Sequence, residues 1–238
     1  MPEVGELLGG KYRIVRPIGE GGTGAVFEAR HEEIGKRVAV KLLHAEHARD
    51  PLAVERFRQE ARASAAIGHR SIIDVYDIGE TDGAPFLVME YLEGESLGSR
   101  LRRQGLLDVP DAAYVACQVL SALHAAHEQG IVHRDLKPDN VFVAQTGEAV
   151  PDVKLLDFGI SQMVDPANPE ERLTRSGVVL GTPYDMAPEQ ARGERRIDAR
   201  VDLYAVGVIL YECLTGRVPF LADNVLALLN KIQHDPVR

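Results

Sequence analysis

The stretch His133-Arg134-Asp135-Leu136-Lys137-Pro138-Asp139-Asn140 is the part of this sequence that decides its fold. It follows the apolar pair Ile131-Val132 and precedes the β-branched run Val141-Phe142-Val143, which predicts a polar loop leading into a strand. A carboxylate, an ammonium and an amide at these offsets can orient a hydroxyl, neutralise phosphate and bind Mg²⁺. A plain solvated loop is the competing interpretation, and we reject it.

A second acidic loop follows the first along the chain. The apolar pair Leu155-Leu156 reads as the end of a strand that delivers Asp157 into the turn Asp157-Phe158-Gly159. Hard oxygen ligands such as the Asp157 carboxylate suit Mg²⁺ that bridges phosphates. The two loops together indicate phosphate chemistry.

A glycine-rich segment lies near the start of the chain, at Gly19-Glu20-Gly21-Gly22-Thr23-Gly24. Glycines let a backbone approach phosphate oxygens closely and offer them its N–H groups. A dinucleotide fold would need a helix after the glycines, but residues 25–29 read as a strand. From these residues alone, phosphate binding and a flexible hairpin both stay open.

The run Val38-Ala39-Val40-Lys41 places a lysine at the end of an apolar strand. A buried ammonium needs a partner, and Glu60 in a predicted helix is a candidate. An edge lysine that reaches solvent and a surface glutamate are the plainer interpretations. Three arginines could also satisfy Glu60, namely Arg56, Arg58 and Arg62.

The pattern of apolar residues changes along the chain. The first third reads as strands at about 12–18, 25–30, 37–43, 72–78 and 86–89, with a helix at 51–67 between Asp50 and Gly68. Helices follow, one running from a cap at Asp108 or Asp111 to Gly130, and others at about 201–214 and 225–233.

Composition narrows the class of protein. The chain has 238 residues, 45% hydrophobic and 26% charged, which indicates one folded domain with two lobes. Its net charge of −9 argues against a general nucleic-acid binder. The N-terminus has no apolar signal region, and the longest apolar run, residues 203–214, is too short to cross a bilayer.

The cysteines and histidines are interpreted as free thiols and as structural or surface residues. Cys117 and Cys213 lie in apolar helical stretches and are predicted to be buried free thiols, as in a reducing compartment. The pairs His44/His47 and His124/His127 lack the further ligands of a zinc site, so we expect structural or surface histidines.

Taken in order, these motifs resemble the protein kinase family, in its bacterial, eukaryotic-like serine/threonine branch. The resemblance covers about residues 12–220 and ends with Ala187-Pro188-Glu189. It implies an α+β, two-lobe fold over residues 1–238. We expect a small antiparallel-sheet N-lobe with one main helix at about 12–90, a hinge at about 90–94, and a larger helical C-lobe at about 95–238.

The resemblance also implies a role for each catalytic residue. Lys41 would contact the α- and β-phosphates and pair with Glu60. Asp135 would orient the substrate hydroxyl and accept its proton, while Lys137 would reach the γ-phosphate. Asn140 and Asp157 would hold two Mg²⁺ (or Mn²⁺) ions. Such a transfer depends on positioning and charge neutralisation.

An ATP pocket follows from the same resemblance. Ile18, Val26 and Ala39 would form its roof and Phe142 its floor, with Met89 beside the purine. The backbone of Glu90 and Leu92 would hydrogen-bond the purine edge. The remaining expected pocket residues are Gly19, Gly21, Gly24, Lys41, Asn140 and Asp157.

Substrate choice and regulation are read from the segment after Gly159. Two features favour serine/threonine over tyrosine substrates. Lys137 follows Asp135 by two residues, and Thr182 is expected to hydrogen-bond both of them. Thr174 and Ser176 are expected sites of autophosphorylation between molecules, with Arg134 gripping the phosphate; plain loop hydroxyls are the alternative. Asp185 stands where the family usually has tyrosine, which affects substrate preference.

These expectations make the chain a kinase of protein serines and threonines that also modifies itself and acts in the cytoplasm. The alternative is a nucleotide-binding pseudokinase or scaffold without catalysis. The resemblance further implies that the C-lobe lacks its last helices; the full-length protein could be membrane-anchored through a missing C-terminal region. Glu189 would then lack a paired arginine, and the apolar side chains of Val206, Leu210 and Leu226 would lose cover.

Overall fold

The computed structural model describes residues 2–145, 151–158, 183–194 and 196–237. The chain divides into two compact units. The N-terminal unit comprises residues 1–68 and 72–93, and the C-terminal unit comprises residues 69–71 and 94–238. The main division therefore lies between Glu93 and Gly94.

An antiparallel sheet of six strands, in the order β1-β2-β3-β4-β6-β5, forms the N-terminal unit. The strands are β1 (Leu7–Leu8), β2 (Tyr12–Glu20), β3 (Gly24–His31), β4 (Arg37–Leu43), β5 (Val75–Thr81) and β6 (Ala84–Glu90). Five of them were predicted. Strand β5 starts later than expected because Ser71, Ile72 and Ile73 are all buried, whereas the strand that follows alternates between exposed and half-buried residues.

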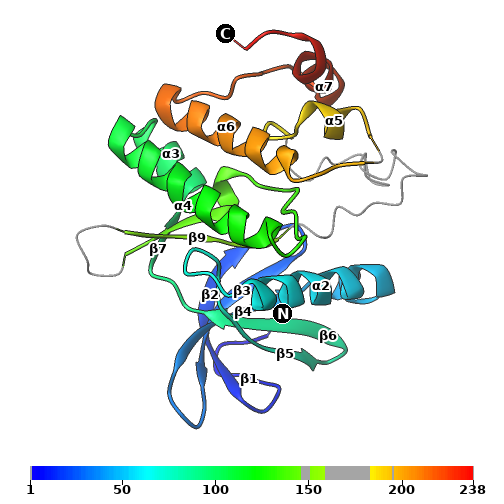
Figure 1. The fold of residues 1–238 in the computed structure, drawn as a ribbon. Helices are drawn as coiled ribbons and strands as arrows, with labels where there is room; N and C mark the ends of the chain where they lie inside the picture. Colours follow the sequence, from blue (N-terminus) through cyan, green and yellow to red (C-terminus); the bar gives the residue numbers. More distant parts are fainter. Residues whose placement is uncertain (1, 146–150, 159–182, 195, 238) are drawn as a thin grey trace. The chain divides into compact units, whose positions relative to one another are not determined.

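The two faces of this sheet carry different clusters. One face holds the larger apolar cluster, which includes Phe27, Val40 and Phe86. On the other face, Leu43 of β4 packs with Phe57 of helix α2 (Pro51–Ile67). Figure 1 shows α2 lying along the sheet. The face shared with α2 is also the face of Lys41, because side chains two residues apart in a strand point the same way.

Helix α2 begins and ends as the sequence predicts. The Asp50 side chain accepts a hydrogen bond from the backbone N–H of Leu52 at 2.9 Å, and Pro51 occupies the first turn. Gly68 closes the helix in a left-handed conformation with φ 59°. The short helix α1 (Ala45–Ala48), which was not predicted, precedes it.

Helices dominate the C-terminal unit. They are α3 (Leu97–Gln104), α4 (Val109–His127), α5 (Pro188–Ala191), α6 (Arg200–Thr215) and α7 (Val225–His234), with the 3-10 turn η1 (Pro138–Asn140). A small antiparallel sheet, in the order β7-β8-β9, joins β7 (Gly94–Ser96), β8 (Val141–Ala144) and β9 (Asp152–Leu155). Helices α4 and α6 lie side by side in Figure 1.

The structure decides one expectation about α4 and corrects another. Of the two candidate caps Asp108 is the one used, because its side chain accepts a hydrogen bond from the Asp111 N–H at 2.9 Å. Cys117 is exposed, whereas Cys213 is buried as predicted. Cys117 lies midway between the buried Val115 and Val119, and a step of two residues turns a helix through about 200° to its opposite side.

The apolar residues that we expected to be exposed by the missing helices differ in their solvent exposure. Val206 is buried on α6, while Leu226 on α7 is 68% exposed. Within the part of the chain that the structure describes, none of the helices is both long and apolar enough to cross a membrane.

Candidate active site

The loop from His133 to Asn140 is fixed through its backbone. Asp202 on α6 is 1% exposed and accepts three hydrogen bonds. Two come from the backbone N–H groups of His133 and Arg134, each at 2.8 Å. The third comes from Nε2 of His127 at the end of α4, at 2.7 Å. Because hydrogen bonds replace the lost hydration of the buried carboxylate, Asp202 can hold the start of this loop firmly.

His133 ties this loop to the second acidic loop. Its side chain is fully buried, and burial lowers the pKa of the imidazole, which favours the neutral ring. Nε2–H donates to the carbonyl oxygen of Leu156 at 3.2 Å, so Nδ1 is the acceptor, and the Asp135 N–H approaches it at 3.4 Å. The ring also lies against Phe158, with centroids 4.9 Å apart.

Two polar side chains of the loop reach the surface, those of Lys137 and Asp135. Nζ of Lys137 lies 2.9 Å from Oδ2 of Asp135, and these side chains are 42% and 36% exposed. The Asn140 side chain is buried at 8%, and its Nδ2 donates to the carbonyl oxygen of Asp135 at 2.8 Å. The sequence-predicted carboxylate, ammonium and amide are therefore brought together.

The hairpin of β8 and β9 places Asp157 next to Asn140. Val141 pairs with Leu155, and the Leu156 N–H donates to the carbonyl oxygen of Asn140 at 2.9 Å. Asp157 follows in a left-handed conformation, with φ 43°. Across the described ranges, no group of three or more His, Cys, Asp or Glu side chains is arranged to hold a metal ion.

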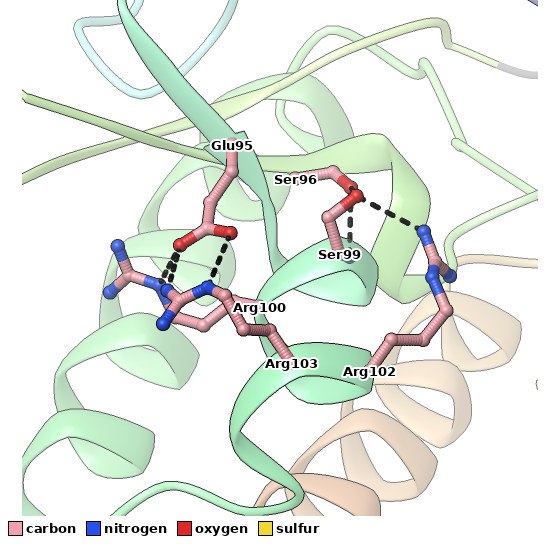
Figure 2. A network of polar contacts seen from close by, with 6 residues as sticks. All are labelled: Glu95, Ser96, Ser99, Arg100, Arg102 and Arg103. Carbon is pink, nitrogen blue, oxygen red and sulfur yellow. Dashed lines mark hydrogen bonds and ion pairs between the residues drawn. The ribbon is translucent and has the colours of Figure 1, made fainter.

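Helix α3 contacts the same loop from another side. Arg102 Nη2 donates to Oδ1 of Asp139 at 3.0 Å and to Oγ of Ser99 at 3.1 Å. A Cβ on Gly98 would lie 2.4 Å from Oδ1 of Asp139, so a larger residue there would displace the Asp139 side chain. Figure 2 shows Arg102 with Ser99 and the capping Ser96, and the separate ion pairs of Glu95 with Arg100 and Arg103.

In the N-terminal unit, Lys41 lies at the centre of the sheet. Its side chain is 9% exposed, and its backbone pairs with Val26 on one side and Leu87 on the other. Paired residues of neighbouring antiparallel strands point to the same face. Glu60, one residue before the packed Ala61 of α2, is half-buried.

Val26 and Ala39, two of the expected ATP-pocket residues of this unit, share the Lys41 face of the sheet. Val26 is directly opposite Lys41, and Ala39 is directly opposite Met89. Ile18 is 39% exposed. The Glu90 N–H is engaged with the carbonyl oxygen of Asp74 at 2.9 Å, so a purine would meet the carbonyl rather than the N–H of Glu90.

Three of the glycines of the turn, Gly19, Gly21 and Gly24, differ in whether packing requires them. A Cβ on Gly24 would lie 2.2 Å from the carbonyl oxygen of Leu42, so the packing of β3 against β4 requires glycine there. The nearest atom to a Cβ on Gly19 or Gly21 would be 3.9 Å away. The fold itself therefore leaves room for larger residues at these two positions.

Two histidines hold this turn from the following segment. Nε2 of His44 lies 3.1 Å from the carbonyl oxygen of Gly21, and Nε2 of His47 lies 3.0 Å from that of Gly22. Since a carbonyl can only accept, both rings donate from Nε2. The pair thus has the structural role expected of it, and His127 has one at Asp202.

Asp185 is the one departure from the expected motif that the structure describes. Burial, followed by the charges of Glu212 and Asp135, raises its pKa to about 7. Its Oδ1 is buried, and no hydrogen-bond partner for it lies among the described residues. It contrasts with Asp202, whose carboxylate accepts three hydrogen bonds.

The expectation for Glu189 overlooked one cation. The hydrogen bond from Arg200 to Asp198 is the main cause of the raised pKa of Arg200, and the charge of Glu189 contributes as well. Arg200 therefore supplies positive charge near Glu189.

Some predicted residues lie outside the described part of the chain, namely Gly159, Thr174, Ser176 and Thr182. Sequence reasoning missed two buried residues that hold the loop, Asp202 and Gln190. A signal existed for Asp202, because an acidic residue stands there in an otherwise apolar helical run.

Comparison with known proteins supports one family. The protein kinase domain family matches residues 12–237. The chain is 47% identical to the serine/threonine-protein kinase Pkn1 of Myxococcus xanthus over 92% of its own length and 31% of that protein. It is 42% identical to the serine/threonine-protein kinase PknA of Mycobacterium tuberculosis over 99% of its own length and 54% of that protein. The chain thus spans about a third to a half of these curated relatives.

A solved structure shows the same fold. The crystal structure of Rad53 residues 1–466 in complex with AMP-PNP matches with a TM-score of 0.73 and 26% sequence identity. The match covers 94% of this chain and 53% of the other.

Proposed function

Because the chain belongs to the protein kinase domain family, we propose that it is a serine/threonine protein kinase, which transfers the γ-phosphoryl group of Mg·ATP to protein hydroxyls. The expected α+β, two-lobe fold class is confirmed by the likeness to the Rad53 structure. One observation carries the proposal: Lys137 lies 2.9 Å from Asp135 in a loop whose backbone is bound to the buried Asp202.

Asp135 and Lys137 would share the work of transfer. The Asp135 carboxylate would accept the proton of the substrate hydroxyl and fix the direction of its oxygen. The Lys137 ammonium would balance negative charge on the transferred group. Both side chains are about two-fifths exposed, so a protein substrate can reach them.

Asn140 and Asp157 would hold the metal ions. The Asn140 amide nitrogen is engaged with the Asp135 carbonyl, which orients its Oδ1 as the oxygen available to a cation. Mg²⁺ usually takes only one or two protein carboxylates and completes its shell with phosphates and water, so a set of two residues fits it. Bound Mg²⁺, or Mn²⁺, would neutralise phosphate charge.

In the N-terminal unit, Lys41 would bind the α- and β-phosphates and Glu60 would steady it. The turn at Gly19 and Gly21 would receive phosphate oxygens, since the fold leaves open space where a side chain could stand. At Gly24, by contrast, the packing of β3 against β4 already explains the glycine. Glycines that packing does not require support a close approach by a ligand.

The purine would lie against the Lys41 face of the sheet. Ile18, Val26 and Ala39 would cover it, with Met89 at its rear edge. The Glu90 carbonyl and the Leu92 backbone would bind the purine edge.

Regulation by autophosphorylation is a further part of the proposal. Thr174 and Ser176 would be modified by a second copy of the chain in a transient dimer, and Thr182 would bond the catalytic pair. Nε of Arg134 is buried, and no partner for it lies in the described ranges, which supports a phosphate ligand there. We also place the reaction in the cytoplasm, where ATP is available.

Two substitutions test the catalytic assignment. Asp135→Asn and Asp157→Ala should each lower phosphoryl transfer to casein by at least about 100-fold, because each removes a group that acts on the reacting atoms or their metal. Asp82→Asn, in the exposed turn between β5 and β6, is the matched control and should keep full activity. Phosphoryl transfer from radiolabelled ATP to casein is the measurement that tests the assignment.

Near-normal transfer by the Asp135→Asn protein would disprove the assignment. No observation favours the alternative of a pseudokinase or scaffold. Nucleotide binding without any transfer by the unsubstituted chain would restore that alternative.

A further inference from the structure

Gln190 is a buried polar residue in the short helix α5, with 5% of its side chain exposed. Glutamine is seldom buried unless its amide is hydrogen-bonded. It follows directly after Glu189, and the catalytic and binding roles proposed above do not include it.

Both ends of the Gln190 amide are engaged, and by different parts of the unit. Oε1 accepts a hydrogen bond from the Ala187 N–H at 3.0 Å. Nε2 donates to the carbonyl oxygen of Arg134 at 2.9 Å. The partners fix the orientation of the amide, because an N–H needs an oxygen opposite it and a carbonyl needs an N–H.

The Arg134 carbonyl belongs to the peptide group that leads directly into Asp135. Arg134 has the disfavoured φ of 65°, and its N–H is held by Asp202. The Gln190 side chain holds the other end of the same residue. Rotation of this peptide would swing the Asp135 carboxylate, so the bonds from Asp202 and Gln190 both help to fix its direction.

The Ala187 N–H lies in the stretch 183–187 that precedes α5, and Ala187 is completely buried. One side chain therefore joins this stretch to the loop that carries Asp135, across 56 residues of sequence.

We propose that Gln190 is a positioning residue that couples the seating of residues 183–187 to the orientation of Asp135. The proposal rests on the kinase function proposed above. It assigns Gln190 no contact with substrate; the residue acts through the Arg134 carbonyl.

Gln190→Glu separates this role from simple helix capping. A glutamate keeps an oxygen for the Ala187 N–H, and negative charge is favourable at a helix N-terminus. It loses the N–H that binds the Arg134 carbonyl and places oxygen against oxygen. We expect kcat for casein to fall about 10- to 100-fold, as for a small misplacement of a reacting group. The Kd for a fluorescent ADP analogue and KM for ATP should remain within about twofold, since their expected ligands are unchanged.

Gln118→Glu is the matched control. Gln118 is on α4, and its Oε1 accepts from Oγ of Ser71 at 3.1 Å, a bond that a glutamate preserves. The control should retain the kcat of the unsubstituted chain. Hydrogen–deuterium exchange of peptides over residues 133–140 gives a second readout, and only Gln190→Glu should speed it.

The outcomes separate the two claims. Unchanged kcat and unchanged exchange in Gln190→Glu would overturn the coupling and leave a capping role. A lower melting temperature with normal kcat would overturn it as well. If the unsubstituted chain transfers no phosphate, the proposed function fails, while the exchange comparison still decides whether Gln190 holds the loop.

Discussion

The loop around Asp135 and the glycine turn around Gly21 both offer polar groups for phosphate chemistry, but they are held in opposite ways. Buried side chains such as Asp202 and Gln190 bind the backbone of the first. The second is bound by His44 and His47, which are partly exposed to water. A hydrogen bond sheltered from water is stronger and costs more to break than an exposed one.

The difference shows where rigidity is built into this protein. A loop that must aim a carboxylate at one atom gains from fixed peptide groups. In the proposed function the glycine turn closes over a flexible polyphosphate, and it would gain from bonds that water can replace. We therefore expect substitutions of the buried anchors to affect stability strongly, and those of the exposed anchors to affect mainly nucleotide binding.

Asp202→Ala should have the largest effect. It leaves the N–H groups of His133 and Arg134 buried without an acceptor, and each such group costs about 1–3 kcal/mol. The free energy of unfolding in urea should fall by about 2–6 kcal/mol. Asp202→Asn keeps one oxygen and should cost less. A loss below about 1 kcal/mol would show that the buried anchors are not what holds the loop.

Asp185 should behave as the opposite of Asp202, because its buried Oδ1 has no hydrogen-bond partner among the described residues. Its folded pKa of about 7 lies above the ordinary value of 3.8. Between these two pH values, the folded state therefore binds more protons than the unfolded state. Stability should therefore fall as the pH rises from 4 to 7 and level off above about 7.

Asp185→Asn removes this titration. Relative to the unsubstituted chain, it should gain a few kcal/mol of unfolding free energy between pH 5 and pH 8, since each pKa unit is worth about 1.4 kcal/mol. Urea unfolding at both pH values measures the difference. Parallel stability curves for the two proteins would show that Asp185 is ionised at little cost.

Alanine substitutions in the glycine turn should split into two classes. Gly24→Ala should destabilise the fold by about 1–3 kcal/mol, because its Cβ would meet the Leu42 carbonyl oxygen. Gly21→Ala should change stability by less than about 0.5 kcal/mol and weaken ATP binding. Thermal melting and nucleotide titration separate the two effects. Equal destabilisation by both would contradict the distinction.

The smallest effects are expected at the two histidines. His44→Ala and His47→Ala each remove one partly exposed bond to the turn, so melting temperatures should hardly change. The Kd for ATP should rise about two- to fivefold, equivalent to about 0.4–1 kcal/mol. His124→Ala, on an exposed face of α4, is the control. An unchanged Kd would mean that the turn needs no anchors.

Much of the fold could be predicted because local signals agreed with one another. Asp50, Pro51 and Gly68 mark the two ends of α2 in ways that depend on backbone chemistry alone. Short runs rich in β-branched residues marked the strands, and the spacing of polar residues marked the loop at 133–140. Predictions failed where packing decides the outcome, as at Cys117 and at the start of β5.

The sequence by itself determined the family, the elements and the polar groups available for chemistry, because these follow from residue type and spacing. Only the tertiary structure decided which groups hold others in place. Asp202 and Gln190 reach the Arg134 backbone from 68 and 56 residues away, and no local pattern reports such a bond. The tertiary structure likewise distinguished Gly24, where packing requires a glycine, from Gly21, where packing does not. The physical reason is that burial and hydrogen bonding depend on which segments meet in space.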